Sequence, residues 1–422
     1  MRGFSTLLFV LFALSANAAD GTLGTVSVQK GNNVSVNGEA PLSLTLDGKG
    51  HQSCQFLSKR APDESHEFTW KEVTTTRGGE LAEILGDQLR SVDSLVVKGY
   101  VNDKDFHAMW DASLYGYLSV INLKNAVLEN NAVPDTAFFH ENEQYEGSSH
   151  EIFYYIGLRK IILPEGLEKI GEGAFYQASA LRQVNFPSTL RYIGDFAFNA
   201  TKLEMNQLVI PEGVEEINQY AFAFCRKLKA QVTLPSTIKK IGEWAFYGCP
   251  ITSINLPEGL ESLGSLAFWD CDLREVSIPS SCHEFNEGWQ FGFNRNLEKM
   301  HLPEGMTEIP DHFAVDCFRL REVNFPHTLK HIGEKAFSLC ISLKNVDLPL
   351  GMQSLGEEAF SELEALEQIV FPASMKSLGK NSCSYWKNIK RIYCAAMEPP
   401  VCNPTDGGVF SGFDFPDGLN TP

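Results

Sequence analysis

Apolar and polar positions follow one pattern that repeats along most of the chain, with a proline at a fixed place in each copy. Successive prolines are 22 to 24 residues apart. A period in this range is typical of a solenoid, in which each copy of the repeat forms one turn that packs against its neighbours. The repeat prolines are Pro164, Pro187, Pro211, Pro235, Pro257, Pro279, Pro303, Pro326, Pro349 and Pro372.

The residues just before each proline predict a β-strand. Inward-facing apolar residues alternate there with outward-facing residues, as around Ile254 and Leu256 or Val323 and Phe325. Strands that recur with one orientation must pair in parallel, about 4.8 Å apart. We therefore predict a β-rich α/β solenoid, a right-handed superhelix of about ten regular repeats plus caps. It is expected to have one continuous parallel β-sheet and short helical or 3-10 turns on the opposite side.

Further columns of equivalent residues follow each proline. The seventh residue is mostly glycine or asparagine, as at Asn218, Gly242 and Gly264, and these residues accept a left-handed backbone. We therefore predict a turn with positive φ there, and a different turn where Pro310 occupies the column. Eleven residues after the proline, a phenylalanine preceded by alanine predicts a buried stack of rings. Its members are Phe175, Phe198, Phe222, Phe246, Phe268, Phe337 and Phe360.

Five of the ten cysteines share one position, fourteen residues after a repeat proline. Because equivalent positions stack in a solenoid, we predict a buried column of thiols that donate weak hydrogen bonds to nearby carbonyls, rather than stacked disulfides. Cys394 and Cys402 are the candidate disulfide, because they bracket a rigid corner that ends in Pro399 and Pro400. Cys54 has no evident partner. The five equivalent cysteines are Cys225, Cys249, Cys271, Cys317 and Cys340.

The full repeat reads Leu-x-x-Val-x-Leu-Pro-x-x-Leu-x-x-Ile-Gly-x-x-Ala-Phe-x-x-Cys, and residues 256–264 and 325–333 match it closely. This pattern resembles the BspA-type leucine-rich repeat family of bacterial surface and secreted proteins, over about residues 81 to 402. The resemblance implies a leucine-rich-repeat solenoid. It also implies a role in adhesion to host or extracellular-matrix proteins or to other cells.

The two ends of the chain depart from the repeat. A positive charge at Arg2, an apolar run over residues 7–14 and small residues at 16 and 18 predict a cleavable signal peptide, since the run is far short of the roughly 20 residues that a membrane span needs. We expect a secreted or cell-surface protein with no transmembrane segment. The predicted segments are a signal peptide (1–18), a small β-rich segment (19–80), an N-terminal cap with atypical first repeats (81–157), regular leucine-rich repeats (158–395) and a C-terminal tail (396–422).

Composition and motifs narrow the class of function. A formal net charge of -18 would repel nucleic acid and anionic membranes, so the expected partner is an extracellular or host protein, or a glycan. We find no nucleophile elbow, metalloprotease helix motif, phosphate-binding glycine loop or inward-facing carboxylate pair, and we predict no enzyme activity and no cofactor. One polar insertion matches no defined metal motif and is predicted to be a solvated loop. It contains His140, Glu141, Glu143, His150 and Glu151.

The outward strand positions two residues before the prolines form the main candidate site. Repeat proteins bind ligands on such ladders, although any exposed sheet face is polar. We predict that changing Asn255, His301 and Asn324 together weakens ligand binding without lowering the melting temperature. The candidate residues are Asn185, Thr233, Asn255, Ser277, His301, Asn324 and Asp347.

A second candidate is an aromatic patch formed by Trp244, Tyr247 and Trp269 on neighbouring turns. Such rings stack on a sugar or hold a protein ligand, or they fill the edge of the ring stack. Together these features predict a non-enzymatic, adhesin-like protein-protein interaction scaffold. The alternative is a glycan-binding module of an envelope nutrient-capture system.

Overall fold

The computed structural model describes four strands between residues 25 and 55, and it describes residues 67–139, 156–402 and 408–410 in full. The predicted signal peptide, the polar insertion with His140 and His150, and the residues after 410 lie outside the described part. The chain forms two compact units. These are Met1–Met205 with Ala221–Leu228, and Asn206–Tyr220 with Lys229–Pro422.

The first unit begins with a four-stranded antiparallel sheet in the order β2-β1-β4-β3. The strands are β1 (Thr25–Val28), β2 (Val34–Asn37), β3 (Leu42–Leu46) and β4 (Gln52–Gln55). Each of the first three coincides with a short run in which apolar and polar residues alternate, a sequence pattern that predicts a strand.

The parallel turns of the first unit start with long strands and short helices. Parallel strands β5, β6, β7, β9 and β11 pair side by side in that order. Leu81, Leu85 and Leu89 recur at helical spacing and are all buried. The elements are β5 (Trp70–Thr75), α2 (Leu81–Leu85), η2 (Gly86–Arg90), β6 (Ser94–Val101), α3 (Asp103–Tyr115), β7 (Val120–Leu128), η3 (Glu129–Asn131), β8 (Ala132–Val133), β9 (Lys160–Ile162), β10 (Lys169–Ile170), β11 (Gln183–Val184) and β12 (Tyr192–Ile193).

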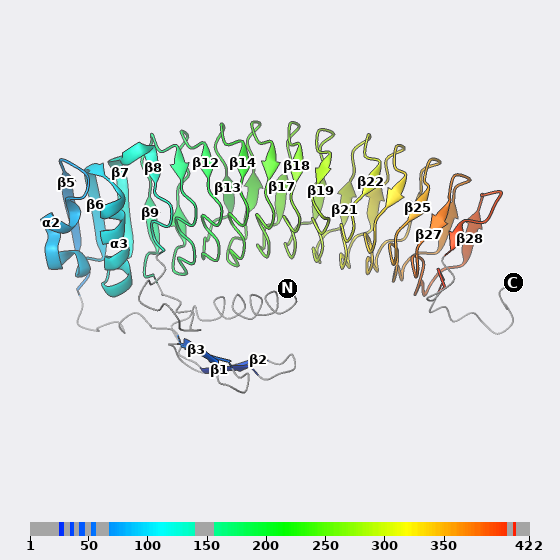
Figure 1. Cartoon of the computed structure of the whole chain (residues 1–422), viewed down its shortest axis with the longest axis horizontal. Coiled ribbons are helices and arrows are strands. Elements are labelled where there is room, and N and C mark those ends of the chain that lie inside the picture. Colours follow the sequence, from blue (N-terminus) through cyan, green and yellow to red (C-terminus); the bar gives the residue numbers. More distant parts are fainter. Residues whose placement is uncertain are drawn as a thin grey trace. The chain divides into compact units, whose positions relative to one another are not determined.

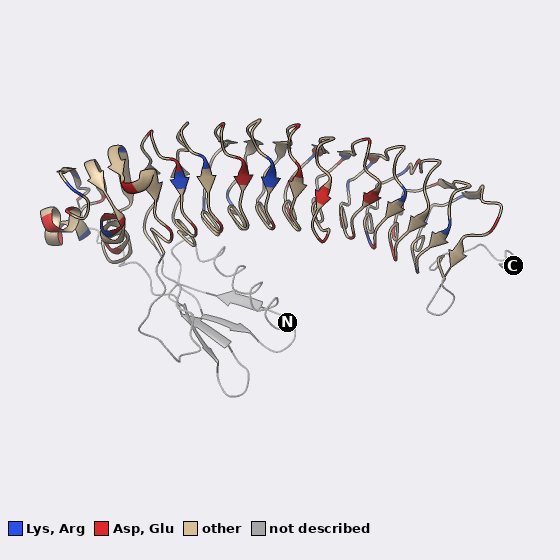
Figure 2. Cartoon of the chain, turned by 45° about the horizontal axis from the view of Figure 1, so that its top comes forward, with Lys and Arg blue, Asp and Glu red and all other residues tan. Residues whose placement is uncertain are grey.

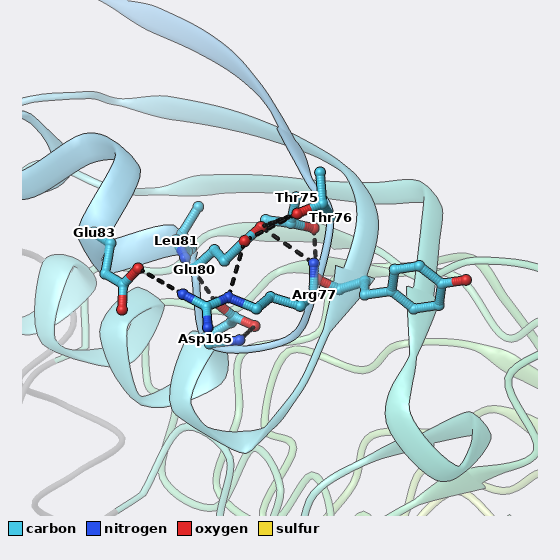
Figure 3. Close-up of polar contacts among 9 residues, drawn as sticks. Thr75, Thr76, Arg77, Glu80, Leu81, Glu83 and Asp105 are labelled. Carbon is cyan, nitrogen blue, oxygen red and sulfur yellow. Dashed lines mark hydrogen bonds and ion pairs between the residues drawn. The ribbon is translucent and has the colours of Figure 1, made fainter.

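A buried carboxylate joins the starts of α2 and α3. Helix α3 begins at a capping box, in which the Asn102 side chain accepts from the N–H of Lys104 and the Asp105 side chain accepts from the N–H of Asn102. Asp105 is 1 % exposed and also accepts from the N–H groups of Gly79 (2.7 Å) and Leu81 (2.9 Å), as Figure 3 shows for Leu81. One side chain thus satisfies backbone donors at both helix starts.

The second unit repeats the same turn, with a strand after each repeat proline and a strand before each of them except Pro349 (Figure 1). The first strand precedes the proline: β13 (Gln207–Val209), β15 (Gln231–Thr233), β17 (Ser253–Asn255), β19 (Glu275–Ser277), β21 (Lys299–His301), β23 (Glu322–Asn324) and β26 (Gln368–Phe371), with β28 (Arg391–Cys394) continuing the series. The second follows the proline: β14 (Glu216–Ile217), β16 (Lys240–Ile241), β18 (Ser262–Leu263), β20 (Glu284–Phe285), β22 (Glu308–Ile309), β24 (His331–Ile332), β25 (Ser354–Leu355), β27 (Ser377–Leu378) and β29 (Val401–Cys402).

The parallel solenoid is confirmed, but its sheets differ from the prediction in two details. The strands before the prolines form separate sheets, β13-β15-β17, β19-β21-β23 and β26-β28, rather than one continuous sheet. The strands after the prolines form further parallel stacks, such as β22-β24-β25-β27-β29. In the described residues after Asn131, hydrogen-bonded turns without helices connect these strands.

The predicted stack of phenylalanine rings is present and buried. In the first unit Phe175 and Phe198 lie 5.1 Å apart between ring centroids with an interplanar angle of 11°, and Phe246 and Phe268 in the second unit lie 5.6 Å apart at 8°. Phe138, Phe291 and Phe313 also belong to the stack. The stacking changes between Phe291 and Phe313, whose rings meet edge to face at 77°.

The predicted positive φ in the glycine column is wrong. None of Gly171, Gly194, Gly242 and Gly264 has a left-handed backbone. Glycine is required instead because the turn before approaches closely: a Cβ on Gly264 would lie 2.4 Å from the backbone nitrogen of Glu243. Pro310 fits the column because no positive φ is needed there.

The left-handed residues lie nine and thirteen positions after the proline, where the chain reverses. Tyr220 and Phe224 have φ of 55° and 60°, and Lys335 and Leu339 have φ of 51° and 62°. A left-handed backbone costs a non-glycine residue roughly 1–2 kcal/mol. The repeated turn therefore depends on the stacking of neighbouring turns to hold these residues in place.

The column of buried thiols is confirmed. Cys225, Cys271, Cys317 and Cys340 are buried, and the Sγ of each lies 3.2 or 3.3 Å from a carbonyl oxygen of the preceding turn. Cys249 is likewise buried, and its Sγ lies 3.9 Å from the carbonyl oxygen of Tyr247. Burial raises the pKa of Cys317 to about 12, so this thiol stays protonated and unreactive at neutral pH.

Candidate ligand-binding face

The strands before the prolines present a free face to solvent. Their residues alternate between exposed and buried, as in β13, β15, β17 and β19, where the middle residue alone is buried. Two columns of side chains therefore point outward, two and four residues before each proline. We call the outward side chains of these strands the pre-proline face.

The predicted asparagines of this face are engaged with the backbone of the preceding turn. The Asn255 side chain accepts from the N–H of Leu234 at 2.8 Å and donates to its carbonyl at 3.3 Å. Asn324 makes the same pair of bonds to Leu302, and in the first unit Asn185 makes it to Leu163. Because each amide closes a gap in the strand ladder, we expect its removal to lower stability as well as any ligand binding.

The other predicted residues of the second unit are available in different degrees. Thr233, Ser277 and Asp347 are exposed, and within the described residues their side chains have no hydrogen-bond partner. His301 of β21 lies near Glu275 of the adjacent strand β19, with its Nε2 at 3.2 Å from the carboxylate. The exposed hydroxyls and the Asp347 carboxylate can therefore bind a ligand without breaking an internal bond.

The sequence prediction missed the column that lies four residues before the prolines. In β13, β15 and β17 it contains Gln207, Gln231 and Ser253, which face each other in register on adjacent strands. All three are exposed, and their side chains have no hydrogen-bond partner within the part of the chain that the structure describes. The period of two would have identified this column, because residues two apart on a strand share a face.

Charge divides the face of the second unit into two sections. The outward side chains of β13, β15 and β17 carry no charge. The next three strands carry Glu275, Lys299 and Glu322, of which Lys299 and Glu322 form an ion pair at 3.4 Å. The pre-proline face thus offers an uncharged hydrogen-bonding section followed by a section of both charge signs.

The strands after the prolines present a surface of a different kind. Some of these strands carry acidic or basic residues and others carry none (Figure 2), and Lys240 of β16 pairs with Glu216 of β14 at 2.6 Å. Lys239 pairs in the same way with Glu215 at 3.3 Å. In these two turns the charged side chains are paired with one another, whereas Gln207, Gln231 and Thr233 of the pre-proline face have no internal partner among the described residues.

The rings of the aromatic patch pack against one another at the edge of the phenylalanine stack, and this geometry does not favour stacking on a sugar. Trp244 stacks on Tyr220 with centroids 5.3 Å apart and an interplanar angle of 14°, and Tyr247 is only 2 % exposed. Trp269 packs on Trp289 at 5.2 Å and covers the backbone of Gly292 so closely that a Cβ there would lie 2.2 Å from its ring. The rings cover one another's faces, whereas a stacked sugar needs an open face.

One open cleft lies in the first unit, at the carboxyl ends of β5, β6 and β7. It encloses about 560 Å³ and is lined by Arg77, Tyr100, Asn102 and Val127 among others. Arg77 pairs with Glu80 (3.1 Å), whose pKa is lowered to about 2, first because the N–H of Thr76 donates to it (Figure 3). Since Asn102 also caps α3, the side chains of Thr76, Arg77 and Asn102 in this cleft already have structural partners.

The predicted disulfide is absent from the structure. Cys394 and Cys402 are both free and exposed, because Cys394 ends β28 while Cys402 ends β29, and these strands belong to different sheets. Within the described ranges, no group of three or more His, Cys, Asp or Glu residues is placed to hold a metal ion. None of the described helices is long and apolar enough to span a membrane.

The structure thus defines a parallel solenoid protein with a polar, exposed strand face. Three overlapping segments, residues 148–231, 230–331 and 312–398, match the model of the BspA-type leucine-rich repeat region. These segments cover more than half of the chain, which therefore belongs to the BspA-type leucine-rich repeat family. The resemblance seen in the sequence is confirmed.

Solved structures of bacterial leucine-rich repeat proteins are similar to this chain. A leucine-rich repeat protein from Bacteroides ovatus is 19 % identical, with 87 % of this chain and 92 % of that chain covered and a TM-score of 0.53. A Treponema protein (T. pallidum leucine-rich repeat protein) is 30 % identical over 37 % of this chain and 76 % of its own, with a TM-score of 0.35. The first of these shows the fold. No curated protein matches the sequence.

Proposed function

We propose that this protein is a non-enzymatic, exported scaffold that holds a protein ligand on its pre-proline face, in the manner of an adhesin. One observation carries the proposal: exposed polar side chains without internal partners lie in register on successive strands, as Gln207 and Gln231 do. Hydrogen-bonding groups left free over several strands suit an extended ligand surface. Export rests on the apolar segment that follows Arg2.

A binding role is favoured over catalysis by the way the polar groups are arranged. Catalytic groups converge on one reacting atom, and each lies within hydrogen-bond reach of it. The outward side chains of β13, β15 and β17 instead stand side by side on parallel strands roughly 4.8 Å apart. Such a ladder contacts many points of a large ligand, which supports a scaffold.

The charged section of the pre-proline face favours a protein as the ligand. Glu275, Lys299 and Glu322 place both charge signs on adjacent strands, and Asp347 adds a free carboxylate further along. Protein surfaces carry both signs, and complementary charges set the orientation and rate of association. A neutral glycan can form hydrogen bonds to these groups but has no charges that complement them.

A neutral glycan is the second candidate, as the ligand of a nutrient-capture module. The uncharged section made by Gln207, Gln231, Thr233 and Ser253 favours it, since amides and hydroxyls can donate to and accept from sugar hydroxyls. The self-covered rings around Trp244 do not support it.

The test measures how tightly two triple variants bind a protein that the unmodified chain captures from an extracellular-matrix extract. Gln207→Ala, Gln231→Ala and Thr233→Ala remove three free groups of the face. Glu284→Ala, Thr307→Ala and Glu308→Ala are the control, at exposed positions in or next to the strands after the prolines. We expect the first variant to bind the captured protein at least about tenfold more weakly, a loss of about 1.4 kcal/mol or more, with an unchanged melting temperature. Equal binding by both variants would contradict the proposal, and a signal confined to a glycan array would favour the second candidate.

A further inference from the structure

The last turn of the second unit leaves its inward side chains open. Strands β26 and β28 pair in parallel, with Ile369 opposite Ile392 and Phe371 opposite Cys394. In β26 these inward residues are buried, at 1 % and 2 % exposure. In β28 all four residues are exposed, and Ile392 is 40 % exposed. The column of apolar side chains that fills the solenoid therefore continues to the surface of this turn.

The other strand of the last turn is open as well. Leu378 of β27 is 5 % exposed, whereas its parallel neighbour Cys402 of β29 is exposed and Val401 is 72 % exposed. Only the side with the ring stack is covered, where Val409 is buried and its carbonyl accepts from the N–H of Cys383 at 3.1 Å. Within the described residues, both strand stacks thus end without a covering element.

An open strand of this kind is an edge for pairing. Strand β28 is bonded to β26 on one side, and its remaining N–H and C=O groups have no strand partner among the described residues. Such edges pair with another strand unless charges, bulges or a covering element prevent it. Three of the four residues of β28, Ile392, Tyr393 and Cys394, are uncharged and add no repulsion.

We propose that a second copy of this chain covers the open end, with β28 of the two copies paired antiparallel about a two-fold axis at Tyr393. This arrangement continues the strand ladder over the apolar column, with one antiparallel pair at the two-fold axis in place of the parallel pairs between turns. A two-fold axis normal to the sheet keeps inward residues inward, because directly opposite residues of antiparallel strands share a face. Ile392 then lies opposite Cys394 of the second copy, and Tyr393 lies opposite its own equivalent.

A second copy fits better than an unrelated protein because the edge is self-complementary. In the two-fold register, each exposed inward residue of one β28 faces an exposed inward residue of the other, and the backbone donors and acceptors match by symmetry. Arg391 is shifted away from its own equivalent, so the two cations do not meet. The same axis brings the exposed strand β29 of both copies to the opposite side of the shared apolar column.

The experiment measures the oligomeric state of the purified full chain by sedimentation at increasing micromolar concentrations. We expect a species of about twice the mass of one chain. Tyr393→Lys places like charges opposite each other and is expected to give the single-chain mass at the same concentrations. Val370→Lys is the matched control, since Val370 pairs with Tyr393 in register, is similarly exposed (49 % against 51 %) and lies one strand inside the edge. It is expected to remain dimeric.

Thiol alkylation gives a second readout that needs no variant. Cys394 is expected to react more slowly as the concentration of protein rises, because Ile392 of the second copy covers it. Buried Cys340 stays unreactive throughout and is the internal control. A chain that is monomeric at all concentrations, or a Val370→Lys variant that dissociates as fully as Tyr393→Lys, would overturn the proposal. A dimer that forms only after residues 411–422 are deleted would overturn it too, because the chain's own tail would then be the occupant.

Discussion

Asparagine side chains replace backbone groups in the strands before the prolines. In two places where the next turn carries no asparagine, the residue before the proline donates to a backbone carbonyl: Ile210 to Thr233 at 3.0 Å and Ile278 to His301 at 2.9 Å. Where it carries one, the side chain takes this N–H and also donates to the carbonyl of the same residue, as Asn255 does for Leu234. The amide therefore satisfies two backbone groups beside a proline, which can donate none itself.

Asn255→Ala is expected to lower the free energy of unfolding by about 1–3 kcal/mol, because it leaves the N–H and carbonyl of buried Leu234 without these bonds. Thr233→Ala is the matched control in the same column, one strand earlier, where no side-chain bond is lost. Its expected change is within about 0.5 kcal/mol. Urea unfolding of both variants measures the difference, and equal losses would show that the amide has no structural role.

The sequence predicts the role of a residue where the same residue type recurs at the same position of several repeats. It does not predict the role where another residue type takes that position. The cysteine column was predicted because five thiols share one position. Asn294 and Trp386 have the same hydrogen-bonding role as the cysteines. Their side chains donate to the carbonyls of Phe268 (2.7 Å) and Phe360 (2.6 Å). A shared hydrogen-bond role between unlike side chains has no signature in the pattern of apolar residues.

At the element scale, the column of glycines shows why the predicted turn was wrong. A glycine in sequence indicates either a positive φ or a close approach, and the residue type alone does not distinguish them. Here the approach of the preceding turn decides, with a Cβ on Gly242 at 2.7 Å from the nitrogen of Gln219 and one on Gly264 at 2.4 Å from that of Glu243. The spacing between turns at this corner is thus set by direct contact between the backbones of neighbouring turns.

Gly264→Ala is expected to destabilise the protein by about 1–3 kcal/mol, since the added methyl group must push two turns apart. Gly351→Ala serves as the control: its φ is not positive, and a Cβ there meets its nearest neighbour at 3.9 Å. That change is expected to be neutral or to stabilise by less than about 1 kcal/mol, through the unfolded chain. Thermal or urea unfolding compares the two, and a stable Gly264→Ala variant would contradict the packing argument.

The number of strands in each turn was predictable only in part. The strands before the prolines were expected from their alternation, and they lie where it placed them except before Pro349, where residues 343–349 form no strand. The strands after the prolines consist of two residues each, such as Lys240–Ile241, and two residues show no period. Their pairing comes from stacking, because equivalent residues of successive turns are brought into register by the rest of the repeat.

At the scale of the whole molecule, stability is the sum of many similar turns and the interfaces between them. The candidate face follows from the same repetition. The column two residues before the prolines was predicted from their spacing. The column of Gln207 and Gln231, two residues earlier on the same strands, was missed because the alternation along each strand was not followed one step further. The open last turn could not be predicted, since it depends on which residues are left uncovered once the turns have stacked.

Deletion of residues 235–256 removes one complete turn of the second unit and joins Leu234 to Pro257. The proline, ring and thiol columns stay in phase, so β15 acquires β19 as its neighbour in place of β17. We expect the variant to fold, to unfold in as many transitions as the full-length chain, and to show a smaller dependence of stability on denaturant, because less surface becomes exposed. The control deletes only residues 246–256, which removes half of the turn and shifts the columns. This variant is expected to lose the cooperative transition in circular dichroism. If the half-turn deletion were as stable as the full-turn deletion, equivalent places in successive turns would not be what holds the molecule together.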